Sequence, residues 1–143
     1  MLLSVLLFAC KKENDFVDED AIGSGVHYYP DILTQHFYDT TSRYNISDAN
    51  FPQGGKVTFE VDFRAREGVT LINLYATTPD KVTRQVESIP YSSDFYSSVK
   101  QADTLFFSYA IPDTVAGNRI DLRVEVVTAA GLSTSQTDYV KVQ

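Results

Sequence analysis

Hydrophobic and polar residues alternate along two segments of the chain. From Val57 to Phe63 every odd position is apolar and every even position is polar, and the same alternation returns over 119–126. A period of two is typical of a β-strand with one buried face. The sequence therefore predicts strands over 56–64 and 119–126. The charged residues of these strands would face solvent and pair across strands: Glu60, Asp62, Asp121, Arg123 and Glu125.

Other segments are rich in β-forming residues and end at turn residues. Residues 69–76 and 103–111 predict strands whose two faces are both more buried than those of the alternating strands. Residues 81–87 predict an edge strand, and 134–142 would close a final hairpin. Residues 91–101 are the exception, either helical or looped, and would form an insertion at one end of the fold.

These elements indicate an all-β fold. About seven short strands, with turn residues between them and no convincing amphipathic helix, favour an immunoglobulin-like antiparallel β-sandwich over a βαβ fold. Its length suits one domain, which we assign to 26–143.

The chain opens with an apolar run, residues 2–9, that is too short to span a bilayer. Its length fits a secretory signal, so 1–9 would be removed. Leu7-Phe8-Ala9-Cys10 resembles the lipobox of bacterial lipoproteins, which implies that Cys10, the single cysteine, is lipidated. A multi-chain anchor of this kind holds a protein on a membrane stably. The alternative, a buried strand with Cys10 in the core, is disfavoured by the charges that follow at once.

Residues 10–25 are highly charged and predict a flexible tether. Asp18, Glu19 and Asp20 lack the spaced loop of a calcium site. The Cys-Lys-Lys-acidic opening resembles signals that direct lipoproteins of Bacteroidetes to the outer surface. We therefore expect a lipid-anchored protein of the bacterial cell envelope, at the outer membrane, on its periplasmic or its surface side.

The net charge of −7 and the pI near 4.6 argue against nucleic acid as a partner, because phosphates demand Lys and Arg patches. They also argue against an electrostatically held membrane surface, so attachment would come from the lipid. With Cys10 committed to lipidation, the mature domain would have no disulfide.

The body of the chain resembles small lipoproteins of Bacteroidetes that carry one immunoglobulin-like or fibronectin-III-like domain. The resemblance covers residues 55–143 and is carried by alternating Val57, Phe59 and Val61, by the Glu67-Gly68 turn, by Tyr109-Ala110-Ile111-Pro112 and by the closing 124–133. These patterns imply an architecture and no particular activity. Core Trp and paired cysteines of antibody domains are missing.

Motifs of catalysis or metal binding are nearly absent. His27 and His36 stand nine positions apart in what we expect to be a loop, without metal-ligand spacing. No serine lies in a Gly-x-Ser-x-Gly elbow. Mixed charges on an exposed sheet do not tune a general acid as a cleft does, so a hydrolase is the weakest hypothesis. We expect no cofactor and no metal.

Aromatic residues provide the candidate binding surface. Those in 27–51, which include Tyr38 and Tyr44, either cap the core or form a surface for a sugar or a protein. Tyr91, Phe95 and Tyr96 in the irregular segment have the same two interpretations. Tyrosine offers a flat face and a hydroxyl at little entropic cost.

Three Asp-Thr motifs resemble the O-glycosylation motif of secreted Bacteroidetes proteins, with Thr40, Thr104 and Thr114 as acceptors. The main hypothesis is a non-catalytic, lipid-anchored envelope module that binds a protein or a glycan. The alternative is a carbohydrate-binding lipoprotein of a polysaccharide-utilisation system.

Overall fold

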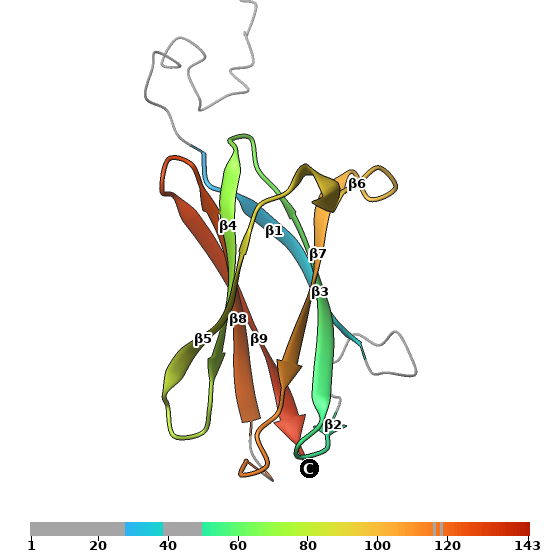
Figure 1. Cartoon of the computed structure of the whole chain (residues 1–143), viewed down its shortest axis with the longest axis vertical. Helices are drawn as coiled ribbons and strands as arrows, with labels where there is room; N and C mark the ends of the chain where they lie inside the picture. The colour runs from blue at the N-terminus through green and yellow to red at the C-terminus, as the bar shows by residue number, and fades with distance from the viewer. Residues whose placement is uncertain (1–27, 39–49, 116, 118) are drawn as a thin grey trace, which may run out of the picture.

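The computed structural model describes residues 28–38, 50–115, 117 and 119–143, which form two packed β-sheets (Figure 1). The first sheet has the order β1-β3-β7-β6 and the second has the order β2-β9-β8-β4-β5. The strands of the first sheet are β1 (Asp31–Tyr38), β3 (Lys56–Arg64), β6 (Tyr96–Ser97) and β7 (Ala102–Ala110). Those of the second are β2 (Asn50–Phe51), β4 (Val69–Thr77), β5 (Thr83–Pro90), β8 (Arg119–Thr128) and β9 (Ser133–Val142).

The strand order confirms the immunoglobulin-like sandwich. Neighbouring strands are antiparallel, except that the short β2 runs parallel to β9. When the long strands and β6 are lettered in chain order, the first sheet has the spatial order A-B-E-D of an immunoglobulin domain. The second sheet has the order G-F-C, with β5 as an added C′ strand. The alternating segments predicted as strands are β3 and β8, and the predicted edge strand is β5, at the edge of the second sheet.

Large apolar side chains from both sheets fill the space between them. Phe59 is fully buried near the centre of the first sheet, with its ring centroid 5.1 Å from that of Phe37 and 5.6 Å from that of Phe107. From the second sheet, Ile72 and Leu122 are also fully buried. Burial of such side chains is the main stabilising term available to a domain of this size.

The structure corrects the expectation that His36 lies in a loop, because Asp31–Tyr38 forms β1 and pairs with β3. A register shift between Ile32 and Thr34 interrupts the alternation, so residues on either side of it break the period of two. Gln35 is buried, and its Nε2 donates to the carbonyl oxygen of Leu122 at 3.4 Å, which ties β1 to the second sheet. The aromatic segment thus contributes Phe37 to the core.

Two expectations about exposure were wrong. β7 has one buried face rather than two, since Leu105, Phe107 and Tyr109 are buried while Phe106 is 55% exposed. On β3, Glu60 and Asp62 are only 7% and 8% exposed although they lie on the outer face. The reason is Lys100, whose side chain covers both carboxylates.

The irregular segment predicted between the strands is present. It consists of the 3-10 helix η2 (Ser93–Phe95), the two-residue β6 and a turn in which Gln101 has a φ of +51°. Ser92 caps η2, because its hydroxyl accepts a hydrogen bond from the amide of Asp94 at 3.2 Å. This segment crosses from the second sheet to the first at one end of the sandwich (Figure 1).

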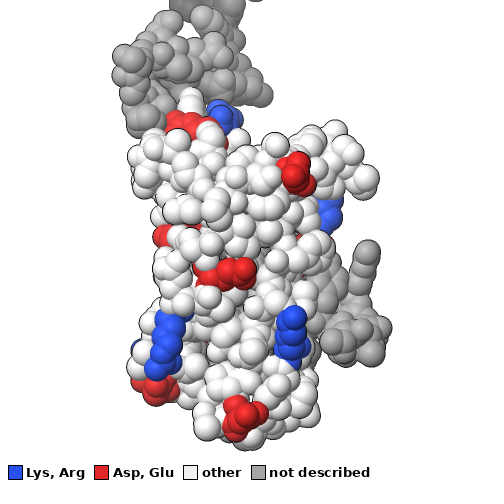
Figure 2. Space-filling model, viewed as in Figure 1, with Lys and Arg blue, Asp and Glu red and all other residues white. Residues whose placement is uncertain are grey.

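On the face shown in Figure 2, acidic and basic side chains are scattered over largely uncharged surface. They do not gather there into one continuous patch of a single sign among the described residues.

Candidate functional site

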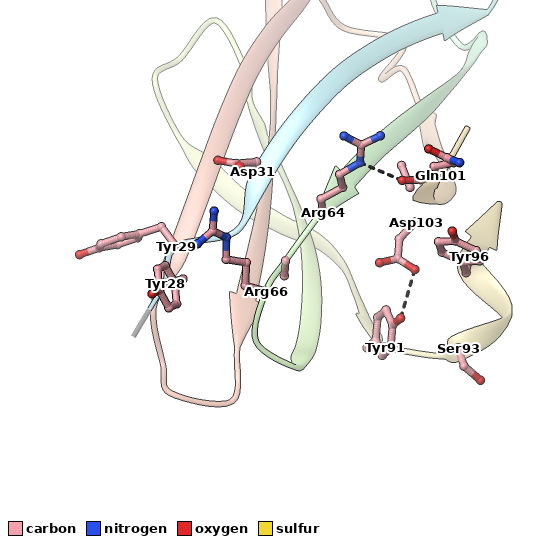
Figure 3. A pocket seen from close by; sticks show the side chains of 12 residues that line it. Tyr28, Tyr29, Asp31, Arg64, Arg66, Tyr91, Ser93, Tyr96, Gln101 and Asp103 are labelled. Atoms are coloured by element: carbon pink, nitrogen blue, oxygen red, sulfur yellow. Dashed lines mark hydrogen bonds between the residues drawn. The ribbon is translucent and has the colours of Figure 1, made fainter. Parts of the chain in front are cut away.

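An open groove with a volume of about 950 Å³ lies at the end of the sandwich where β1 begins (Figure 3). We call it the end groove. Three segments that are far apart in the sequence form it: the start of β1, the end of β3, and the irregular segment with the start of β7. Its lining residues are Tyr28, Tyr29, Asp31, Arg64, Ala65, Arg66, Tyr91, Ser93, Tyr96, Gln101, Ala102 and Asp103.

Tyrosine side chains form much of this lining. Tyr29 is 64% exposed and Tyr96 is 58% exposed, so both present ring surface to solvent. Tyr91 is held more firmly: its hydroxyl donates to Asp103 Oδ1 at 3.1 Å, and its ring makes an edge contact with Phe95 at 5.8 Å between centroids. Burial, and after it the hydrogen bond and the charge of Asp103, raises the pKa of Tyr91, so the phenol stays protonated.

Two arginines complete the lining. The Arg66 guanidinium lies 4.9 Å from the ring centroid of Tyr28, a cation–π contact. Arg64 Nε donates to the carbonyl oxygen of Gln101 at 2.8 Å and so fixes the turn that forms one wall. With Asp31 and Asp103, the groove carries two positive and two negative side chains, a formal balance on a chain whose net charge is −7.

A cluster of charges on the outer face of the first sheet, in which Lys100 pairs with two buried carboxylates, supports that wall. Lys100 Nζ donates to Glu60 Oε1 and, at 3.0 Å, to Asp62 Oδ1. Hydroxyls from two flanking strands also donate to Asp62: Thr104 to Oδ1 at 2.7 Å and Thr34 to Oδ2 at 3.0 Å. The cluster therefore holds the turn before β7 down on the first sheet.

The hydrogen bonds in this cluster decide its ionisation. Burial alone would raise the pKa of Asp62, but hydrogen bonds from Thr104, Lys100 and Thr34 hold it below its usual value. Burial alone would lower the pKa of Lys100, but hydrogen bonds to Glu60 and Asp62 raise it. Both groups are therefore charged at neutral pH.

A second polar network lies on the outer face of the second sheet. Glu125 Oε2 accepts hydrogen bonds from Asn73 Nδ2 and from the Tyr75 hydroxyl, both at 3.1 Å. The Arg123 guanidinium lies 4.1 Å from the Tyr75 ring centroid. Asp121 pairs with Arg119 on the same strand. The expected pairing across strands is present for Glu125, whose partners Asn73 and Tyr75 lie on β4, whereas Asp121 pairs within its own strand.

The structure brings together two of the predicted aromatic residues, Tyr91 and Tyr96, and places Phe95 behind Tyr91. Tyr38 ends β1, but its side chain lies outside what the structure describes, as does that of His36. Cys10, His27, Thr40 and Tyr44 lie outside the described residues.

The two described acceptor threonines differ in environment. Thr104 uses its hydroxyl as a donor to Asp62, whereas Thr114 is exposed in the loop after β7. Tyr28 and Tyr29 belong to the aromatic segment 27–51 that the sequence singles out, whereas nothing in the sequence indicates the contributions of Arg64 and Arg66.

The groove offers few groups for acid–base chemistry. Its carboxylates, Asp31 and Asp103, lie on either side of Arg64 (Figure 3), and Asp103 is bonded to Tyr91. Within residues 28–38, 50–115, 117 and 119–143, no three His, Cys, Asp or Glu side chains are grouped to hold a metal. The described residues also include no helix long and apolar enough to cross a membrane.

The sequence matches no protein-family model and no curated protein. Solved structures do resemble the fold. A superoxide reductase (neelaredoxin) from Ignicoccus hospitalis has a TM-score of 0.53 at 8% identity, over 81% of each chain. The C-terminal domain of wzt has a TM-score of 0.50 at 10% identity, over 80% of this chain and 73% of the other. Identities this low show a shared β-sandwich and nothing about activity.

Proposed function

We propose that this protein is a non-catalytic, lipid-anchored binding module of the bacterial cell envelope, and that the end groove is its binding site. The observation that carries the proposal is the convergence of Tyr28, Tyr29, Tyr91 and Tyr96 on one groove. Tyrosines are favoured at binding surfaces, where the ring packs and the hydroxyl forms hydrogen bonds.

The position of the groove agrees with an anchor at Cys10. The described chain begins at Tyr28, which lines the groove and leads directly into β1, so the N-terminal segment joins the sandwich at this end (Figure 1). A partner held in the groove would therefore be bound beside the attachment point of the tether. This arrangement suits a protein that presents its site at the outer membrane.

The charge and shape of the groove favour a neutral glycan as one class of partner, which is the role of a carbohydrate-binding lipoprotein. Tyrosine faces stack on sugar rings, and Asp31, Gln101 and Arg66 supply donors and acceptors for sugar hydroxyls. The balanced formal charge gives no preference for a strongly charged ligand. A protein segment is the other class, since aromatic residues and arginine also dominate protein interfaces.

Hydrolysis is the least supported activity. A retaining or inverting glycosidase needs two facing carboxylates, one of them with a raised pKa. In the end groove Asp103 accepts a hydrogen bond from Tyr91, and Arg64 lies between Asp103 and Asp31 (Figure 3). We therefore assign the groove to binding.

Substitution of the groove tyrosines tests the binding site. The Tyr91→Ala/Tyr96→Ala double variant should lose at least about 2 kcal/mol of binding free energy, more than tenfold in affinity, because truncation of central aromatic anchors costs this much. Binding would be screened with the parent chain on a glycan array and by capture of envelope proteins. Val82→Ala, an exposed apolar residue outside the groove, is the matched control. Equal binding by the double variant and the parent would remove the groove from the proposal.

Mass spectrometry tests the anchor. The native protein should lack residues 1–9 and carry lipid on Cys10, and a Cys10→Ser variant should appear in the soluble fraction instead of the membrane. A native chain that keeps Met1 and carries no lipid would refute the anchor while leaving the groove proposal open to its own test.

A further inference from the structure

Most of one edge of β7 has no strand beside it. On one side β7 pairs with β3 along 103–110. On the other side β6 pairs only with Ala102 and Asp103. Within the described part of the chain, residues 104–110 therefore form an open edge of the first sheet. The backbone groups along such an edge can still pair with another strand.

The second sheet extends one strand further on this side and leaves β5 uncovered. Residues 83–88 of β5 are all exposed. In register, Arg84 pairs with Ala76 and Glu87 with Leu74, and both of those partners are buried between the sheets. Arg84 and Glu87 are thus on the inward face of β5, yet they reach solvent. A covering strand beside β7 would normally bury this face.

The uncovered part of β5 faces β7 across the open side. Arg84 lines a pocket of about 430 Å³ together with Pro112 and Val115, which follow β7. The Arg84 charge also acts on Tyr109 of β7, opposing the rise in pKa that burial causes in that phenol. β5 and β7 border the same open side in Figure 1, and the surface there carries separated acidic and basic groups (Figure 2).

The two open edges differ in how they are protected. β5 carries Arg84 and Glu87, has a register shift opposite Leu74 and Tyr75, and ends at Pro90. Charges, bulges and proline are the usual means by which proteins block edge pairing. Residues 104–110 of β7 include no charged residue and no proline, and their register with β3 is unbroken. The edge of β7 is therefore the one suited to accept a strand.

The overhang of β5 limits what can bind there. A second folded copy that offered its own β7 edge would bring its own projecting β5 and β4 against this β5. A single extended strand has no second layer, so the projecting β5 does not exclude it from the edge of β7. We propose that this edge is an acceptor site for one extended peptide segment of a partner protein, which adds a strand to the first sheet.

The direction of the strands specifies the peptide further. β7 runs from Asp103, at the end groove, toward Tyr109, near Arg84, and a peptide antiparallel to β7 passes Arg84 before Glu87. Its inward side chains, which alternate along the strand, should be acidic and then basic. This site is separate from the end groove and does not depend on it.

A synthetic peptide of the sequence acetyl-Thr-Glu-Thr-Lys-Thr-Val-Thr-amide tests the site by calorimetry and amide hydrogen exchange on the full chain. We expect it to bind at least tenfold tighter than two controls, one with Glu and Lys exchanged and one methylated on every backbone nitrogen. Bound peptide should increase protection of amides within 104–110. An Arg84→Glu/Glu87→Lys variant should prefer the exchanged peptide.

Three results would overturn the acceptor site. They are equal affinity for the three peptides, no added protection in β7, and an unchanged preference in the charge-exchanged variant. Tyr96→Ala should leave peptide binding unaltered. Loss of peptide binding in Tyr96→Ala would place the peptide in the end groove and refute a separate site.

Discussion

Phe59→Ala is expected to lower the free energy of unfolding by about 3–5 kcal/mol, the largest single-residue effect on stability that the structure implies. Phe59 is fully buried and its ring packs between Phe37 and Phe107, on the strands that flank β3. Truncation removes contacts to both neighbours at once and leaves a cavity in the centre of the first sheet. Urea unfolding followed by circular dichroism measures the change.

A matched control is available on the adjacent strand. Phe106 is 55% exposed, so Phe106→Ala should cost less than about 1 kcal/mol. If Phe59→Ala does not fold, Phe59→Leu keeps most of the volume and should cost about 1 kcal/mol or slightly more. Similar losses for Phe59→Ala and Phe106→Ala would show that the two faces of the first sheet are assigned incorrectly.

Lys100→Met is expected to lower the free energy of unfolding by about 1–3 kcal/mol at pH 7, since it leaves two nearly buried carboxylates without their cation. The Lys100 side chain is 35% exposed, so water screens part of the ion pair and the loss stays below that of a fully buried one. Lys56→Met, an exposed substitution on β3, is the control and should stay within about 0.5 kcal/mol of the parent.

The pH dependence of this effect has a definite sign. In the parent, folding lowers the pKa of Asp62 below its usual value of 3.8. The ionised carboxylate therefore stabilises the folded state above pH 3.8, and this stabilisation is lost as the pH falls through the folded-state pKa. In Lys100→Met, Asp62 loses the hydrogen bond and the positive charge of Lys100, which hold its pKa down, so protonation of Asp62 becomes easier. The deficit of the variant should therefore be largest at neutral pH and shrink in acid. A deficit that is constant with pH would contradict the charge cluster.

Most strands could be predicted because their period of two survives in the sequence. β3 and β8 alternate without interruption, and their predicted starts at residues 56 and 119 agree with Lys56 and Arg119 in the structure. β1 could not be predicted in this way. Its register shift between Ile32 and Thr34 changes which side chains point inward, so the apolar pattern loses its period.

The burial of Glu60 and Asp62 shows a second limit of prediction from hydrophobic alternation. Alternation correctly puts both on the outer face of β3, and outer charged residues are usually exposed. Lys100, which covers them, is 40 and 38 positions away in the sequence and belongs to a turn. Only the pairing of β7 with β3 brings that turn over the two carboxylates.

The sequence predicts only part of the end groove, because strand pairing brings its remaining residues together. Tyr91 and Tyr96 stood out because aromatic residues in an irregular segment have no strand to explain them. Tyr29 lies in the aromatic segment 27–51, but the local pattern does not show that it meets Tyr91, and Arg66 carries no signal at all. Both reach the groove because β1 pairs with β3 in a register that sets Asp31 beside Arg64. Sites assembled from separate segments depend on topology, which local patterns do not contain.

The most direct test of the account is photocrosslinking of the native, membrane-bound chain in cells, with p-benzoylphenylalanine in place of Tyr96. Benzophenone inserts into C–H bonds of glycans and proteins alike, so either class of partner is captured. The same substitution at Thr137, which is exposed on β9 and lies outside both proposed sites, is the control. We predict one dominant adduct at position 96 and little at position 137. No adduct at 96, or equal labelling at both positions, would contradict a binding module whose site is the end groove.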